Sequence, residues 1–195
     1  MENRGLLMVI ADPHPAIEEE FNAWFDTEHY AERMTIRGFR TGKRFVSCDR
    51  AGRYLALYDL DDVAVLHSDE YRAFGAAKMS AWTRRILPRQ PSIRHEASQI
   101  HPGDALQVTC PRHLLLRFDG MDEGALRQLT DWIVAESTAA PGVVQRRLFR
   151  ITDAEDGTYL AIISGAGELA QTLELAGLGE AFRCMTLMET FAPYR

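Results

Sequence analysis

The 195-residue sequence has few cysteines, no excess of positive charge and no long apolar run, and each absence excludes a class of protein. Its three cysteines, Cys48, Cys110 and Cys184, lie far apart, which indicates thiols in a reducing cytoplasm and not a disulfide framework. A net charge of -6 argues against a nucleic-acid surface. No apolar segment approaches the roughly 20 residues of a membrane span, and no secretory signal begins the chain. We therefore expect a cytoplasmic protein that binds neither nucleic acid nor membrane.

Motifs for metals and common cofactors are also missing. The sequence has no CxxC pair and no compact cluster of histidine and cysteine, so no zinc site is expected. Glycine-rich phosphate loops and the GxSxG turn of hydrolases are absent. A haem would need an axial histidine or cysteine in a large apolar cavity, and no pattern marks one. We expect a protein that uses neither metal nor cofactor.

Residues 15–34 have the periodicity of one amphipathic helix at about 100° per residue. One face of this helix is apolar and carries Ile17, Phe21, Trp24 and Phe25. A polar stripe follows the edge of that face and carries Asn22, Asp26, His29 and Arg33. Glu28 projects from the middle of the apolar face, where an unpaired carboxylate would be very costly.

These side chains are the ones that acid–base chemistry uses at the wall of a pocket. His29 is the candidate general base or acid, because imidazole titrates near neutral pH, and we expect Asp26, one turn earlier, to raise its pKa. We expect Glu28 to be buried beside Arg44 or Lys43, as a second acid or base or as a structural ion pair. The alternative is an ordinary surface pair of Asp26 with His29.

An internal repeat organises the chain. The segment Gly52–Tyr58 matches Gly157–Ile163, and Gly38–Phe45 parallels Gly142–Phe149, at an offset of about 105 residues. Each half predicts the order β-α-β-β-α-β. Strands are expected at residues 6–11, 39–47, 54–60, 92–99, 114–118, 143–151, 159–164 and 186–191. Helices are expected at residues 15–34, 63–85 with a break near Gly75, 123–139, 169–175 and 180–184.

This order predicts an α+β fold with two tandem ferredoxin-like units, residues 1–100 and 101–195. Two such units can pair their sheets into a closed barrel within one chain, which removes the exposed edges. Two independent domains joined by the polar segment 101–104 are the alternative. We favour docking because this linker is short. The sequence does not determine the oligomeric state, and a homodimer is possible.

The sequence resembles the dimeric α+β barrel superfamily, nearest to the branch that includes EthD-like proteins. The resemblance spans most of residues 5–98 and, more faintly, 112–192. The residues that carry it are Leu6–Val9, Phe21–His29, Glu32–Arg33, Gly38–Phe39, Arg44–Phe45, Tyr54–Tyr58, Tyr71 and Trp82–Arg84. The chain departs from the expected pattern at Ala31 and Arg37, where the family has proline, so the helix exit is expected to differ. The superfamily includes cofactor-free monooxygenases, polyketide cyclases, lactone isomerases and haem enzymes, so the fold leaves the reaction open.

The second half lacks the polar constellation of the first. Aligned through Gly38 and Gly142, His29 falls opposite Ile133, and Glu28 falls opposite Trp132. This predicts a single polar pocket, carried by the first half. Aromatic residues expected to line it are Trp24, Tyr58 and Trp82, whereas Tyr54 recurs in the second half and is expected to be structural.

These observations predict a small cofactor-independent enzyme. His29, Asp26 and Glu28 would be catalytic, and Asn22 and Arg33 would bind a carbonyl or enolate oxygen beside Trp24, Tyr58 and Trp82. The reaction would be isomerisation, cyclisation, dehydration or decarboxylation of a small carbonyl or aromatic compound. The alternatives are a cofactor-free monooxygenase, because an enolate can react with oxygen, and a non-catalytic protein that binds small molecules or assembles with partners.

Overall fold

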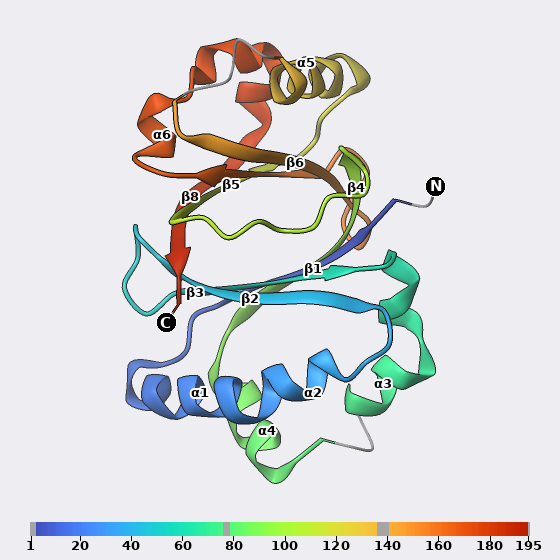
Figure 1. The fold of residues 1–195 in the computed structure, drawn as a ribbon, viewed down its shortest axis with the longest axis vertical. Coiled ribbons are helices and arrows are strands. Elements are labelled where there is room, and N and C mark those ends of the chain that lie inside the picture. The colour runs from blue at the N-terminus through green and yellow to red at the C-terminus, as the bar shows by residue number, and fades with distance from the viewer. Residues whose placement is uncertain (1–2, 76–78, 136–140, 195) are drawn as a thin grey trace.

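Eight antiparallel strands close into a barrel that is flanked by helices on two opposite sides (Figure 1). The computed structural model describes residues 3–75, 79–135 and 141–194. The strands are β1 (Gly5–Ala11), β2 (Phe39–Ser47), β3 (Tyr54–Leu60), β4 (Ser92–His101), β5 (Arg112–Phe118), β6 (Val143–Ile151), β7 (Tyr159–Gly165) and β8 (Met185–Pro193). All eight strands predicted from the sequence are present, with ends that shift by a few residues.

The helices form two layers, one for each group of four strands. Below the barrel in Figure 1 lie α1 (Glu18–Trp24), η2 (Phe25–His29), α2 (Tyr30–Met34), α3 (Asp69–Gly75) and α4 (Ala81–Ile86), with the short turns η1 (Pro15–Ile17), η3 (Val63–His67) and η4 (Leu87–Arg89). Above it lie α5 (Glu123–Val134), α6 (Leu169–Thr172) and η6 (Leu175–Cys184). The helix predicted for residues 123–139 ends at Val134, and residues 136–140 lie outside the described part of the chain. No helix among the described residues is long and apolar enough to cross a membrane.

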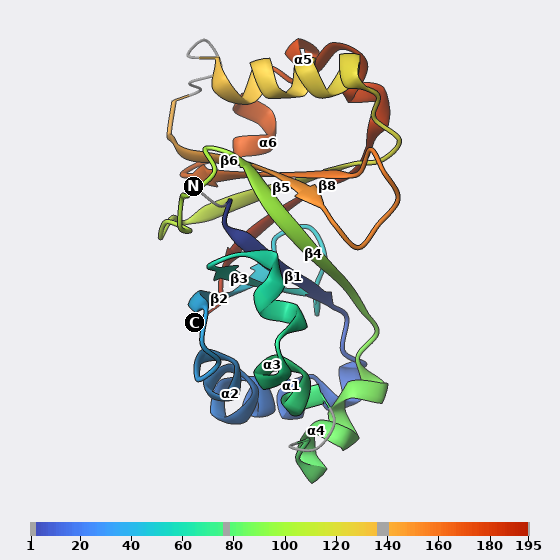
Figure 2. The same ribbon diagram turned by 90° about the vertical axis from the view of Figure 1, so that its right-hand side faces the viewer.

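The barrel closes because each half pairs its outer strands with the other half. We call the sheet β4-β1-β3-β2 with its helices the first half, and β6-β7-β5-β8 with its helices the second half. One seam joins β2 to β8, from Phe45 opposite Pro193 to Ser47 opposite Phe191. The other joins β4 to β6, and Figure 2 shows β4 crossing the barrel beside β1. The predicted α+β fold, with two ferredoxin-like units docked as a barrel, is confirmed, whereas the domain boundary at residue 100 stays a prediction.

The structure has three apolar cores, one inside the barrel and one between the sheet and the helices of each half. They are separate because successive side chains along a strand point to opposite faces of the sheet. On β1, Leu6, Met8 and Ile10 face the barrel interior, while Leu7 and Ala11 pack against the helices of the first half. The barrel core continues with Phe45, Leu55, Leu57, Ala97, Leu115, Phe149, Ile151, Leu160, Ile162 and Phe191. The second half has its own core between its sheet and α5.

Charged side chains also enter the barrel, and they join the two halves. Asp59 on β3 accepts a hydrogen bond from Arg147 Nη1 on β6 at 2.6 Å, and both side chains are fully buried. Asp59 also accepts hydrogen bonds from the Thr41 hydroxyl and the Gln107 backbone N–H. A second pair of this kind joins Arg53 to Glu189. Removing one partner of a buried pair leaves an uncompensated charge, which costs more than the pair contributes.

We predict that either single variant, Arg147→Met or Asp59→Asn, lowers the free energy of unfolding by roughly 3–5 kcal/mol, because each leaves one buried charge unpaired. The double variant should lose less than either single one. As a control, Arg40→Met breaks an exposed pair with Asp61 and should cost less than about 1 kcal/mol. Urea unfolding measures the free energy of unfolding of these four variants. The prediction would be contradicted if the two single variants lost no more stability than the control.

Candidate active site

The first helical layer is interrupted where the candidate histidine lies. The predicted continuous helix over residues 15–34 is wrong in this respect, because α1 passes into the π-helical turn η2 before α2 begins. The Tyr30 backbone N–H bonds to the Phe25 carbonyl, five residues earlier. This extra residue in the turn changes the direction of the side chains that follow, and π-turns are frequent at functional sites.

The π-turn places His29 against the apolar face and not along the polar stripe. Its ring centroid lies 4.5 Å from that of Trp24 and 5.1 Å from that of Phe25. Asp26 points elsewhere and bonds to Arg44, so the prediction that Asp26 tunes His29 is wrong. The predicted stripe is therefore divided between two environments.

Arg44 on β2 organises one of these environments. Its guanidinium donates to Asp26 Oδ1 at 2.7 Å and to Asn22 Oδ1 at 2.5 Å. The guanidinium carbon also lies 4.2 Å from the ring centroids of both Phe25 and Tyr194. Arg44 is thereby fixed between the first helical layer and the end of β8, with only 7% of its side chain exposed.

Tyr54 extends the same network. Its hydroxyl accepts from Asn22 Nδ2 and donates to Glu18, which holds the start of α1 on β3. The structural role expected for Tyr54 therefore has a visible cause. Asn22 donates to Tyr54 and accepts from Arg44, so it belongs to the network that joins α1 to β2 and β3, and its role in binding a substrate oxygen stays a prediction.

Glu28 has hydroxyl partners and no cation. It accepts from Ser80 Oγ at 2.5 Å and from Thr83 Oγ1 at 2.9 Å, and the Thr83 hydroxyl also accepts from Trp24 Nε1. The predicted pairing of Glu28 with Arg44 or Lys43 is wrong, because hydroxyl donors at the start of α4 satisfy the carboxylate. Glu28 therefore ties the π-turn to α4 as a positioning residue.

An enclosed cavity of about 40 Å³ lies between α1, η2 and the sheet, and we call it the inner cavity. Three side-chain atoms of its lining are fully enclosed and have no hydrogen-bond partner among the described residues: His29 Nδ1, Tyr58 Oη and Arg44 Nε. The remaining lining residues are Val9, Ala11, Phe21, Trp24, Phe25, Tyr54, Leu55, Ala56 and Gln90. Such atoms cost roughly 1–3 kcal/mol each unless something bonds to them.

Burial and two arginines set the protonation of the inner cavity. Burial lowers the pKa of His29 from its ordinary 6.5 to about 3, and the charges of Arg33 and Arg44 act in the same direction. Burial raises the pKa of Tyr58 above its usual range, although the same two arginines oppose this shift. At neutral pH the imidazole is therefore neutral and the phenol protonated, in a field that favours negative charge.

Two further predicted residues lie beside this cavity and not in its lining. The Arg33 guanidinium carbon lies 5.1 Å from the ring centroid of Tyr71 and 5.8 Å from that of Phe74, and Arg33 Nη1 is enclosed without a partner among the described residues. Trp82 Nε1 on α4 is enclosed in the same way. Of the predicted site residues, the structure brings His29, Trp24 and Tyr58 into one lining.

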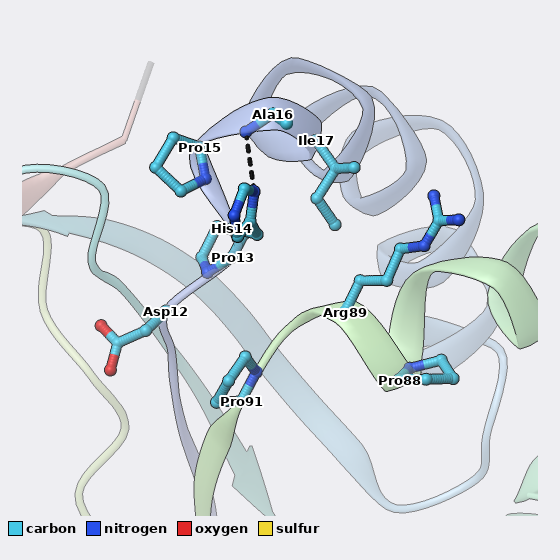
Figure 3. Close-up of a pocket in the computed structure, with 9 residues that line it drawn as sticks. All are labelled: Asp12, Pro13, His14, Pro15, Ala16, Ile17, Pro88, Arg89 and Pro91. Atoms are coloured by element: carbon cyan, nitrogen blue, oxygen red, sulfur yellow. Dashed lines mark hydrogen bonds between the residues drawn. The ribbon is translucent and has the colours of Figure 1, made fainter.

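A larger open groove of about 610 Å³ is lined by residues 12–17, 88, 89 and 91, and we call it the outer groove. Figure 3 shows its walls, formed by η1 and the loop before it on one side and by η4 and the residues after it on the other. Its polar groups are mostly satisfied, since His14 Nδ1 accepts from the Ala16 N–H and Asp12 pairs with Arg53. The outer groove can therefore accommodate the body of a ligand but has few polar groups free to react with it.

The prediction of a single polar pocket is too simple. A third cavity of about 250 Å³ lies at the seam of β2 and β8, and a fourth of about 140 Å³ lies at the hairpin of β6 and β7. Under α5, Trp132 and Ile133 are buried in the core of the second half, at the positions that match Glu28 and His29. No group of three or more metal-ligating side chains occurs within residues 3–75, 79–135 and 141–194.

The fold is shared with solved structures of low sequence identity. No protein-family model matches the chain, and no curated protein matches it in sequence. An anthrone oxidase-like protein superposes with a TM-score of 0.71 at 11% identity, over 100% of this chain and 92% of its own. A protein named as a candidate monooxygenase, from Fusobacterium nucleatum, superposes with a TM-score of 0.60 at 7% identity, over 98% of this chain and 92% of its own. A protein named as a candidate chlorite dismutase superposes with a TM-score of 0.63 at 8% identity, over 100% of this chain and 96% of its own. The likeness shows the dimeric α+β barrel fold.

The lowered pKa of His29 predicts an acid-sensitive fold. The unfolded chain binds a proton near pH 6.5, whereas the folded chain does so only near 3, so the contribution of this group is full above 6.5 and is lost as pH falls toward 3. Urea unfolding from neutral pH to about pH 4 should show the wild type losing more stability than His29→Gln. Parallel pH profiles of the two proteins would contradict the shift.

Proposed function

We propose that this chain is a cofactor-independent enzyme that acts on a small carbonyl or phenolic compound at the inner cavity. The observation that carries the proposal is that three residues which line one cavity each have an enclosed polar atom without a partner among the described residues: His29 Nδ1, Tyr58 Oη and Arg44 Nε. A substrate oxygen can accept from the phenol and the guanidinium, and a neutral imidazole can take a proton from the neighbouring carbon.

The charges around the cavity support enolate chemistry. Arg33 and Arg44 lower the pKa of His29, so a substrate that becomes an oxyanion offsets their effect and makes the imidazole a better base as the reaction proceeds. Proton removal by His29 leaves an enolate, whose oxygen lies in the field of the two arginines. Return of the proton at another carbon completes an isomerisation. A decarboxylation would instead form the enolate by breaking the bond to a carboxylate with release of carbon dioxide, and a proton from water would then add to the carbon.

The dimensions of the two spaces suggest how a substrate lies. The inner cavity has a volume of about 40 Å³, and one water needs roughly 10–15 Å³ by the same measure, so the cavity holds a few waters or one small reacting group. Ala11 and Gln90 line the inner cavity, and the next residues along the chain, Asp12 and Pro91, line the outer groove. We place the body of the substrate in the outer groove, which has a volume typical of ligand sites.

A cofactor-free monooxygenase is the second candidate. In this candidate dioxygen would reach the enolate from the outer groove, because the inner cavity has room only for the reacting group. The enolate carbon would pass electrons to dioxygen and form a hydroperoxide, which loses water to leave a new carbonyl. The names of the anthrone oxidase-like and monooxygenase neighbours point the same way. The helix motif Phe21–His29 supports placing the sequence in the EthD-like branch.

We predict that His29→Ala cuts turnover by roughly 100-fold or more, because it removes the proton acceptor. Its stability at neutral pH should stay within about 1 kcal/mol of the wild type. The matched control is His67→Ala, since that imidazole is exposed and pairs with Glu96 away from the cavity. Cyclic ketones and phenolic polyketide-like compounds are screened by solvent deuterium exchange and by oxygen uptake. Full turnover by His29→Ala would contradict the proposed reaction and favour a non-catalytic binding protein.

We predict that Tyr58→Phe lowers kcat by roughly 100-fold with little change in shape, because one donor to the developing oxyanion is lost. Its free energy of unfolding should be equal to or above that of the wild type, since the variant removes a buried hydroxyl that has no partner. Kinetics and urea unfolding of the same preparation test both statements. A stable variant with unchanged kcat would take Tyr58 out of the reaction.

A further inference from the structure

The cavity at the seam of the barrel, which we call the seam cavity, is a different space from the inner cavity, although Arg44 lines both. It has a volume of about 250 Å³ and lies where β2 of the first half meets the end of β8. Residues 108–110, between β4 and β5, form another wall. Its lining consists of Lys43, Arg44, Phe45, Val108, Thr109, Cys110, His113, Pro193 and Tyr194. The seam cavity is formed by residues from both halves, so it depends on closure of the barrel.

Among the described residues, the lining has positive charge and no carboxylate. Lys43 Nζ donates to Thr109 Oγ1 at 2.7 Å, and among the described residues it has no ion-pair partner. An ammonium group has three donors, so hydrogens remain for an acceptor in the cavity. Arg44, by contrast, already bonds to Asp26 and Asn22.

A buried histidine lies in the same wall with one nitrogen unused. His113 is 1% exposed, and its Nδ1 lies 2.8 Å from Ser164 Oγ. Its Nε2 is fully enclosed and has no hydrogen-bond partner among the described residues. A buried polar atom of this kind calls for a ligand, a water or an ion.

The surroundings of His113 disfavour further positive charge. Burial lowers the pKa of His113 to about 4; a backbone hydrogen bond with Cys110 opposes this shift, and the charges of Arg147 and Lys43 add to it. The imidazole is therefore neutral at pH 7. Arg147 lies deeper in the barrel, where Asp59 is its partner. An anion in the cavity would relieve the repulsion between these groups.

We propose that the seam cavity binds a small carboxylate with an apolar body. The carboxylate accepts from Lys43 Nζ and Thr109 Oγ1 and from His113 Nε2 when that nitrogen carries the proton. The apolar body lies against Phe45, Val108 and Tyr194. A phosphate dianion fits less well, because Lys43 is the one cation of the lining without a carboxylate partner and the rest of the wall is largely apolar.

The first experiment uses benzoate as the probe and calorimetry as the readout, with benzamide as the uncharged analogue of the same shape. Benzoate should bind saturably, and benzamide at least roughly tenfold more weakly. Lys43→Met should weaken benzoate binding by roughly tenfold or more, because it removes the ammonium and keeps the aliphatic stem. The matched control is Arg127→Gln, which removes one exposed positive charge on α5 and should bind like the wild type.

A second measurement locates the probe. Cys110 lines the seam cavity and is buried, whereas Cys48 is exposed and Cys184 is partly exposed elsewhere. Benzoate should slow alkylation of Cys110 by iodoacetamide, followed by mass spectrometry, and leave the rates of the other two thiols unchanged. His29→Ala should bind benzoate like the wild type, which separates this proposal from the proposed reaction. No saturable binding at millimolar benzoate, or binding lost in His29→Ala and kept in Lys43→Met, would overturn the proposal.

Discussion

The pairing of outer strands between the two halves is the constraint on which the rest of this structure depends. A four-stranded ferredoxin-like sheet exposes two edges, and here β2 pairs with β8 and β4 pairs with β6, so no edge of the barrel is left open. Closure also creates an interior that neither half has alone, filled by apolar side chains and by the buried pair of Asp59 with Arg147. The same closure carries Tyr194 of the second half onto Arg44 of the first, so the candidate site draws on both halves.

Arg44 and the π-turn η2 together shape the inner cavity. Arg44 takes Asn22 and Asp26 as partners, which joins α1 and η2 to β2. The π-turn brings His29 onto Trp24 and Phe25, and the hydroxyls of Ser80 and Thr83 hold Glu28 at the same turn. The result is an imidazole with an enclosed Nδ1, in a cavity that Tyr58 also lines; burial lowers the pKa of this imidazole to about 3, and the charges of Arg33 and Arg44 act in the same direction. A chain optimised for stability alone would not keep these polar atoms without partners.

The two halves differ in how they use the same space. Beneath α5, the positions that match Glu28 and His29 hold Trp132 and Ile133, and apolar packing occupies the layer. Beneath η2, the layer holds a cavity with unpaired donors. Retention of polar groups in one half and apolar filling in the other agree with one working site supported by a scaffold. The positive lining of the seam cavity is a third environment, produced where the halves meet.

The sequence by itself determined the eight strands, their order and the α+β class, because period-two alternation and glycine turns are local properties that repeat in both halves. It also identified His29, Trp24 and Tyr58, which share the inner cavity. Only the tertiary structure decided the partners. A wheel at about 100° per residue assumes an unbroken α-helix, so it misplaced His29 relative to Asp26 once η2 added a residue to the turn. Asp26 pairs with Arg44, and Glu28 accepts hydrogen bonds from Ser80 and Thr83. These contacts join separate elements, and helical periodicity carries no information about which elements pack together.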